Sequence, residues 1–130
     1  MQPEGIEPGE PKDWLRHARS DLELARMPRN SRILLEDLCF HAQQATEKAL
    51  KAVLVFSSVS FPRTHNIRTL MDLLLEGLSL PEDAKGAAVL TDYAVMARYP
   101  GDFEPVTEEE YLDAVRIAEA ALRWAENIVK

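Results

Sequence analysis

The chain has little of several things that define other classes of protein. Its 130 residues include one cysteine, Cys39, and only five glycines. A single cysteine excludes the intrachain disulfide framework of a small secreted domain. No apolar run approaches the roughly 20 residues that span a bilayer, and the first residues lack the basic and apolar regions of a signal peptide. We therefore expect a cytoplasmic protein with a core of its own and no membrane partner.

Positive charge and metal-ligating residues are also scarce. Lys and Arg number 15 against 22 Asp and Glu, which gives a formal net charge of -7. An acidic chain repels a polyanion on average, so a nucleotide would need a local basic site. The three histidines fall on separate segments, without the short spacings of a zinc site, and no glycine-rich loop could cradle a phosphate. We expect neither a metal nor a cofactor.

What the sequence does contain is helical periodicity along nearly its whole length. Apolar residues recur at steps of three and four, and the short Val53 to Val59 run continues a helical phase. Residues 1–10 carry three acids and one large aliphatic residue, Ile6, which favours a flexible acidic tail. The sequence thus predicts an all-α protein, an up-and-down antiparallel bundle of four to five helices over residues 11–130.

Five helices are delimited by caps and breakers. The first is followed by Pro28, the third is capped by Thr64 or Asn66, the fourth opens at Pro81, and Thr107 with Glu110 forms a capping box for the last. The expected ranges are about 11–27, 31–57, 67–78, 81–97 and 108–130.

The second predicted helix is the longest and should lie at the centre of the bundle. Its apolar stripe holds Leu34, Leu38, Ala45, Ala49, Ala52 and Phe56. A flank beside the stripe carries Asp37, His41, Gln44, Lys48 and Lys51 at helical spacing. Another flank carries Leu50 and Leu54, which suggests a partner helix, such as one from a second copy.

The break at Ala97-Arg98-Tyr99-Pro100 is the first candidate site. Pro100 disfavours helix at Tyr99, so Arg98 is set at a turn where its guanidinium could reach a phosphate or carboxylate. Arg98 could equally complement the end of its helix or pair with Asp102 or Glu104. Tyr99 is either a core aromatic residue or a stacking platform.

The histidines give two further candidates. His41 shares its flank with Lys48, Asp37 and Gln44, a set that could support catalysis or could be an ordinary solvated face with Glu47. His65 precedes the third helix and either helps to cap it or faces the central cleft of the bundle.

Four segments resemble the HEPN domain family, the nucleotide-binding module of higher eukaryotes and prokaryotes. They are residues 13–22 (DWLRHARSDL), 40–52 (FHAQQATEKALKA), 64–67 (THNI) and 97–100 (ARYP). The resemblance implies a dimerising bundle of four or five helices. It also implies a minimal nucleotidyltransferase partner, often in a toxin–antitoxin pair.

Members of this family that cleave RNA carry an Arg followed after four to six residues by a His. No arginine stands at that distance before any histidine of this chain, and no histidine follows Arg98. We therefore expect no catalytic residues, and a nucleotide-binding or partner subunit that is non-catalytic or weakly catalytic. Two alternatives remain, a ribonuclease toxin using His41 or His65 with Arg98, and a pure assembly module.

The residues expected to bind nucleotide or RNA are those assigned to the cleft of the expected dimer. Lys48 and Arg98 would hold phosphate, and Tyr99 would stack on a base or accept a nucleotidyl group from the partner. The site set is Lys48, His65, Arg98 and Tyr99, supported by a polar flank of Asp37, His41, Gln44 and Lys51.

Overall fold

The computed structural model describes residues 9–28, 30, 32–98 and 104–129. Its elements are α-helices and one 3-10 helix, and the described residues form no strand. They are α1 (Pro11–Ala25), α2 (Leu35–Phe56), α3 (Ile67–Asp72), the 3-10 helix η1 (Glu82–Leu90), α4 (Thr91–Arg98) and α5 (Glu108–Ile128). The prediction of an all-α antiparallel bundle is confirmed.

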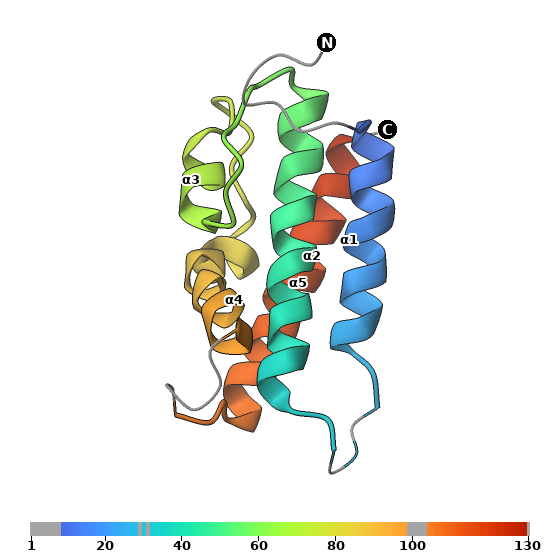
Figure 1. The fold of residues 1–130 in the computed structure, drawn as a ribbon. Coiled ribbons are helices and arrows are strands. Elements are labelled where there is room, and N and C mark those ends of the chain that lie inside the picture. Colours follow the sequence, from blue (N-terminus) through green and yellow to red (C-terminus); the bar gives the residue numbers. More distant parts are fainter. Residues whose placement is uncertain (1–8, 29, 31, 99–103, 130) are drawn as a thin grey trace.

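Helix α2 forms the axis of the bundle. It runs through the middle of Figure 1, with α1 on one side, α3 and α4 on the other, and α5 behind it. Helix α1 runs antiparallel to α2, and the chain then descends through η1 and α4 before α5 climbs back. Because neighbours surround it, α2 buries side chains on more than one flank, including Leu38, Ala45, Leu50 and Leu54.

Two predictions about which side chains of α2 are buried are therefore wrong. Leu50 and Leu54 are fully buried within the chain, so the expectation that their flank awaits a partner helix is wrong. Leu34 and Phe56 are exposed rather than core residues, because they lie at the two ends of α2. Leu34 is the N-cap, in extended conformation, so α2 begins at Leu35 rather than near residue 31.

Helices α1 and α5 are held together along their length. Leu15, Ala18, Leu22 and Ala25 face the core from α1, as their spacing predicts. The Tyr111 hydroxyl of α5 donates to the Ala25 carbonyl at 2.7 Å, and the Arg26 guanidinium contacts Glu119. Since Tyr111 is buried, this hydrogen bond satisfies the one polar atom that the ring brings into the core.

The predicted caps are confirmed. Thr107 Oγ1 accepts from the Glu110 amide at 3.1 Å, and Glu110 Oε1 accepts from the Thr107 amide at 2.9 Å. Asn66 caps α3 by accepting from the Thr69 amide at 3.2 Å. Helix α3 ends at Asp72, earlier than expected, and Gly77 lies beyond it with a φ of 89°, a conformation that glycine adopts without steric cost.

The predicted fourth helix is divided into η1 and α4. The buried residues of η1 are Ala84, Ala87 and Leu90. This strict three-residue step matches the 3.0 residues per turn of a 3-10 helix, in which every third side chain lies on one face. Val89 falls off that face and is exposed, whereas Tyr93 of α4 is buried.

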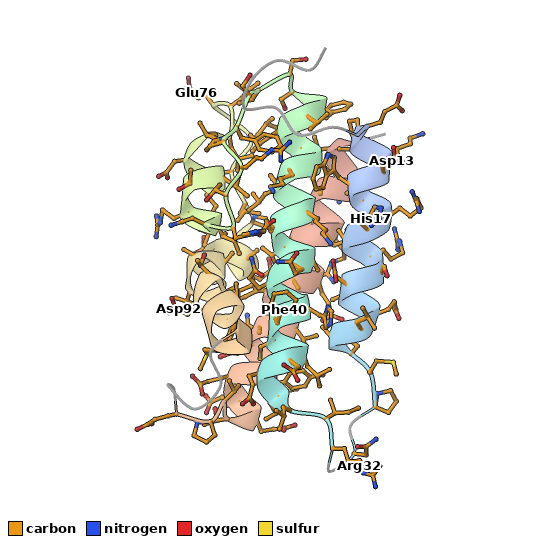
Figure 2. The ribbon with its side chains drawn as sticks, in the orientation of Figure 1. Asp13, His17, Arg32, Phe40, Glu76 and Asp92 are labelled. Atoms are coloured by element: carbon orange, nitrogen blue, oxygen red, sulfur yellow. The ribbon has the colours of Figure 1, made fainter. Side chains whose placement is uncertain are left out.

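Most of the predicted acidic tail, residues 1–8, lies outside the described residues, as do Tyr99 and Pro100 of the predicted break. No helix in the described part of the chain is long and apolar enough to cross a membrane. Figure 2 shows Arg32, in the α1–α2 connection, at the end of the bundle opposite Glu76.

Candidate functional site

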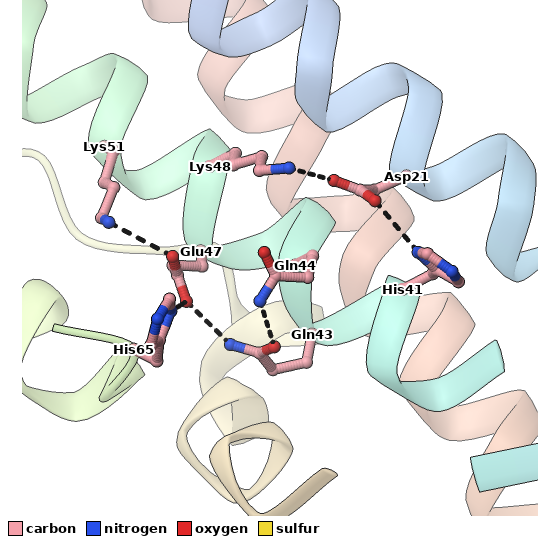
Figure 3. A network of polar contacts seen from close by, with 8 residues as sticks. All are labelled: Asp21, His41, Gln43, Gln44, Glu47, Lys48, Lys51 and His65. Atoms are coloured by element: carbon pink, nitrogen blue, oxygen red, sulfur yellow. Dashed lines mark hydrogen bonds and ion pairs between the residues drawn. The ribbon is translucent and has the colours of Figure 1, made fainter. Parts of the chain in front are cut away.

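A buried carboxylate on α2, that of Glu47, is the centre of the first polar network. Only 2% of its side chain is exposed. Oε1 accepts from Gln43 Nε2 at 2.9 Å and is also 2.9 Å from His65 Nδ1, while Oε2 lies 3.2 Å from Lys51 Nζ (Figure 3). A charge taken out of water needs this many partners, because an unpaired buried carboxylate would cost several kcal/mol.

Lys51 serves as the counter-charge of Glu47. Its side chain is 3% exposed, and its ammonium lies 5.4 Å from the centre of the Trp14 ring and 5.7 Å from that of Phe61. Aromatic faces attract a cation, so the two rings help to stabilise it in the core. In the described arrangement Lys51 is thus paired with Glu47 inside the protein.

His65 is the one member of this network that faces solvent to a large extent. Its side chain is 54% exposed, with Nδ1 on the Glu47 carboxylate. The turn that carries it is fixed on both sides, because Thr64 Oγ1 accepts from the Asn66 amide at 3.0 Å and Asn66 caps α3. With Nδ1–H donating to the carboxylate, Nε2 is left to accept a proton or, when protonated, to donate to an anion.

A second network crosses from α2 to α1 and is centred on Asp21. Asp21 Oδ1 lies 3.0 Å from His41 Nδ1, and Oδ2 lies 2.6 Å from Lys48 Nζ (Figure 3). The His41 ring also makes an edge contact with Phe40, with the ring centres 5.4 Å apart. This network joins two helices, and its lysine and histidine are both partly exposed.

The polar flank predicted for α2 is therefore divided between two networks. His41 and Lys48 belong to the Asp21 network, and Lys51 to the Glu47 network. Gln44 extends the Glu47 network, because its Nε2 donates to Gln43 Oε1 at 2.9 Å. Asp37 is exposed in the first turn of α2, where a negative charge favours the helix N-terminus.

The two residues of the break cannot be placed in either network. Arg98 is the last residue of α4, and its side chain lies outside the described part of the structure. Tyr99 lies outside the described residues altogether. Ligand binding by Arg98 and Tyr99 stays a prediction.

The sequence interpretation missed Asp21 and considered Glu47 only as part of a solvated face, although these two carboxylates organise the networks. Asp21 stands three residues after Ala18 and four before Ala25, so the helical period itself puts it on the buried stripe of α1. Glu47 lies three residues before Leu50, on the flank that the bundle covers. An acid in phase with buried apolar residues was the available signal, since such residues are almost never buried unpaired.

Burial keeps the Cys39 thiol and the Tyr93 phenol in the neutral state. Burial, with smaller contributions from Glu110 and Glu36, raises the pKa of the Cys39 thiol to about 12. Burial also raises the pKa of the Tyr93 phenol to about 12, and Glu110, Asp113 and Asp92 add to the effect. A thiol that stays protonated is a poor nucleophile, so Cys39 offers no covalent chemistry.

Comparison with known proteins agrees with this architecture. The sequence profile of the HEPN domain matches residues 11–128. The chain therefore belongs to the HEPN domain family.

Three relatives illustrate the match. A protein of Methanocaldococcus jannaschii named "Putative toxin MJ1304" is 28% identical over 137 residues, covering 92% of this chain and 83% of that protein. The crystal structure of TT1696 from Thermus thermophilus superimposes with a TM-score of 0.75 at 31% identity, covering 91% of this chain and 97% of the other. ST0689, described as an archaeal HEPN homologue, gives a TM-score of 0.72 at 29% identity, covering 95% and 100%.

Proposed function

We propose that this chain is a HEPN subunit of a toxin–antitoxin pair that binds the phosphate of a nucleotide or RNA through His65. The observation that carries the proposal is the pairing of the exposed His65 ring with the buried Glu47 carboxylate. A carboxylate on Nδ1 fixes the orientation of an imidazole and leaves Nε2 as the ring nitrogen that can contact an anionic oxygen. The toxin name of the Methanocaldococcus relative supports the functional class.

Three buried polar side chains lie beside the exposed His65 ring, and their burial supports a functional role for this histidine. Glu47, Gln43 and Lys51 occupy core positions where apolar side chains of similar volume would stabilise the fold equally well or better. Gln43 and Lys51 both contact the Glu47 carboxylate, which in turn contacts His65. The network thus contributes a positioned imidazole more than it contributes stability.

Lys48, Arg98 and Tyr99 complete the proposed site. Lys48 is 23% exposed and would share its ammonium between Asp21 and a phosphate. Arg98 would add a bidentate phosphate contact and Tyr99 a stacking surface, in the cleft of a homodimer. The proposed partner is a minimal nucleotidyltransferase, for which Tyr99 would be an acceptor.

Isothermal titration calorimetry with ATP, other mononucleotides and short RNA tests the ligand. We expect saturable heat for the natural chain and at least about a tenfold loss of affinity in His65→Ala, the size of one charge-assisted hydrogen bond. His17→Ala is the matched control, because it removes an exposed imidazole from α1 instead. Absence of heat at millimolar ligand would remove the ligand half of the proposal.

The adjacent open reading frame tests the partner. A short neighbouring gene with a Gly-Ser pair followed by spaced aspartates would supply the transferase, and pull-down of its product by this chain would support the pair. Failure of the two purified proteins to associate would contradict it.

A second candidate function, a metal-independent ribonuclease, is favoured by one observation. Both His41 and His65 hold a carboxylate on Nδ1, the arrangement that prepares an imidazole for proton transfer. Expression in a bacterial host separates this candidate from the first. Growth arrest relieved by Arg98→Ala would favour the enzyme, whereas unimpaired growth with intact RNA would count against it.

A further inference from the structure

One hollow of the described surface lies away from both polar networks. It has a volume of about 500 Å³ and is formed by the last turns of α5, the segment 77–81 and the start of η1. None of these elements carries His65, Glu47 or Asp21. Small-ligand sites occupy roughly 300–1,000 Å³ and combine an apolar wall with a few converging polar groups, so the size fits such a ligand.

The lining of the hollow combines an aromatic ring with groups that hydrogen-bond at its edge. Trp124 is half-buried and forms part of the wall, with Leu78 and Ile128 beside it. The Asn127 amide, one turn of α5 away from Trp124, is exposed at the same hollow. An amide offers one acceptor and two donors in a plane, which matches the edge of a flat heterocycle better than that of an aliphatic ligand.

Charged groups at the rim are balanced rather than of one sign. Arg123 Nη2 lies 3.9 Å from Asp83 Oδ2, and both side chains are well exposed. A guanidinium that already faces a carboxylate gives the hollow little net attraction for a bare phosphate. Recognition here would depend on ring stacking and the amide instead of on anionic charge.

We propose that this hollow, lined by Trp124 and Asn127, binds a planar nitrogen heterocycle of the purine-base class. The ring of the ligand stacks against the indole, and the Asn127 amide donates to and accepts from its edge. Base–aromatic stacking contributes about 1–3 kcal/mol in other proteins, and a paired amide discriminates by a similar amount. The inference goes beyond the proposed function, because it uses none of the residues that hold phosphate.

Tryptophan fluorescence gives a direct test with adenosine, which has a base but no phosphate. The chain has two tryptophans, Trp14 and Trp124. We expect adenosine to change the fluorescence of the natural chain saturably and ribose 5-phosphate to leave it unchanged. The response should persist in Trp14→Phe and disappear in Trp124→Phe. A response that follows Trp14, or an equal response to ribose 5-phosphate, would overturn the inference.

A pair of matched asparagine variants tests the edge contact. Asn127→Ala should weaken adenosine binding about tenfold, the lower part of the range for a paired amide. Asn30→Ala changes an exposed asparagine beside Arg32, at the other end of the bundle, and should leave binding unchanged. Equal affinities in the two variants, or no saturable response up to millimolar adenosine, would contradict the inference.

The two proposals fail separately. His65→Ala should leave adenosine binding intact, because adenosine carries no phosphate for His65. If ATP binds with no contribution from Trp124 or Asn127, the inference fails and the phosphate site remains. If adenosine binds at Trp124 but His65→Ala does not change the affinity of any phosphate ligand, the proposed phosphate site fails and the inference stands.

Discussion

The two carboxylates that anchor the networks on α2 have the same kinds of partner but different surroundings. Each lies near a histidine Nδ1 and a lysine ammonium. The Glu47 and Lys51 side chains are both nearly inaccessible to water, whereas that of Asp21 is 11% exposed and its Lys48 partner more so. The Asp21 network can exchange its contacts for water, and it holds α1 against α2. The buried Glu47–Lys51 pair cannot, and His65 is the most exposed member of its network.

Glu47→Ala should produce the largest effect of any single change in these networks. It leaves the Lys51 ammonium buried without its carboxylate and also removes the acceptor of Gln43. We expect a loss of about 3–5 kcal/mol in the free energy of unfolding, measured by urea denaturation. A loss below about 1 kcal/mol would mean that water reaches the pair and that the contrast with Asp21 is wrong.

Replacing the pair as a unit sharpens the same contrast. Glu47→Leu with Lys51→Met removes both charges while keeping most of the volume. The double variant should recover at least half of the stability that Glu47→Ala loses, because buried ion pairs add little net stability over apolar packing. Denaturation of Glu47→Leu, Lys51→Met and the double variant measures the coupling. Additive losses would contradict a direct interaction between the two side chains.

Asp21→Ala should cost less, about 1–2 kcal/mol. Lys48 and His41 are each partly exposed, so they regain water when the carboxylate is removed. The same denaturation series, run beside Glu47→Ala, gives the comparison. A loss equal to that of Glu47→Ala would show that the two networks are equally closed to solvent.

His65→Ala should have the smallest effect on stability and a large effect on phosphate binding. More than half of the ring is exposed, and Glu47 keeps Gln43 and Lys51 as partners. We expect a change within about 1 kcal/mol in stability, together with the loss of affinity described above. His41→Ala is the control in the other network. A larger effect of His41→Ala on phosphate affinity would move the site to Asp21.

Much of the fold follows from local rules that act within one or two turns of helix. The Thr107 capping box at the start of α5 depends on spacing alone, and it appears as predicted. The three-residue step of Ala84, Ala87 and Leu90 is compatible with the 3-10 helix η1. Over a short run, however, the same spacing also fits an α-helix, so the sequence did not separate η1 from α4. Tertiary packing decided between them.

The candidate site was less predictable, because its contacts join residues far apart in the chain. His65 and Lys48 were singled out by residue type, but their partners Glu47 and Asp21 depend on how α1 and α3 pack on α2. Leu50 and Leu54 were wrongly assigned to a partner helix, because the sequence does not show which helices of the same chain cover that flank of α2. Periodicity gives the direction of a side chain around its own helix, and it does not give the number of neighbours that surround that helix.

The central claim is that Glu47 holds His65 with Nε2 available to a phosphate. Long-range proton–nitrogen NMR spectra of the three histidines during a titration with AMP measure this directly. We predict that the His65 Nε2 resonance shifts and saturates, and that His17 and His41 stay constant. The shift should disappear in Glu47→Gln, because a neutral amide replaces the carboxylate that holds Nδ1. Equal movement of all three histidines, or an unmoved His65 at saturating AMP, would contradict the account.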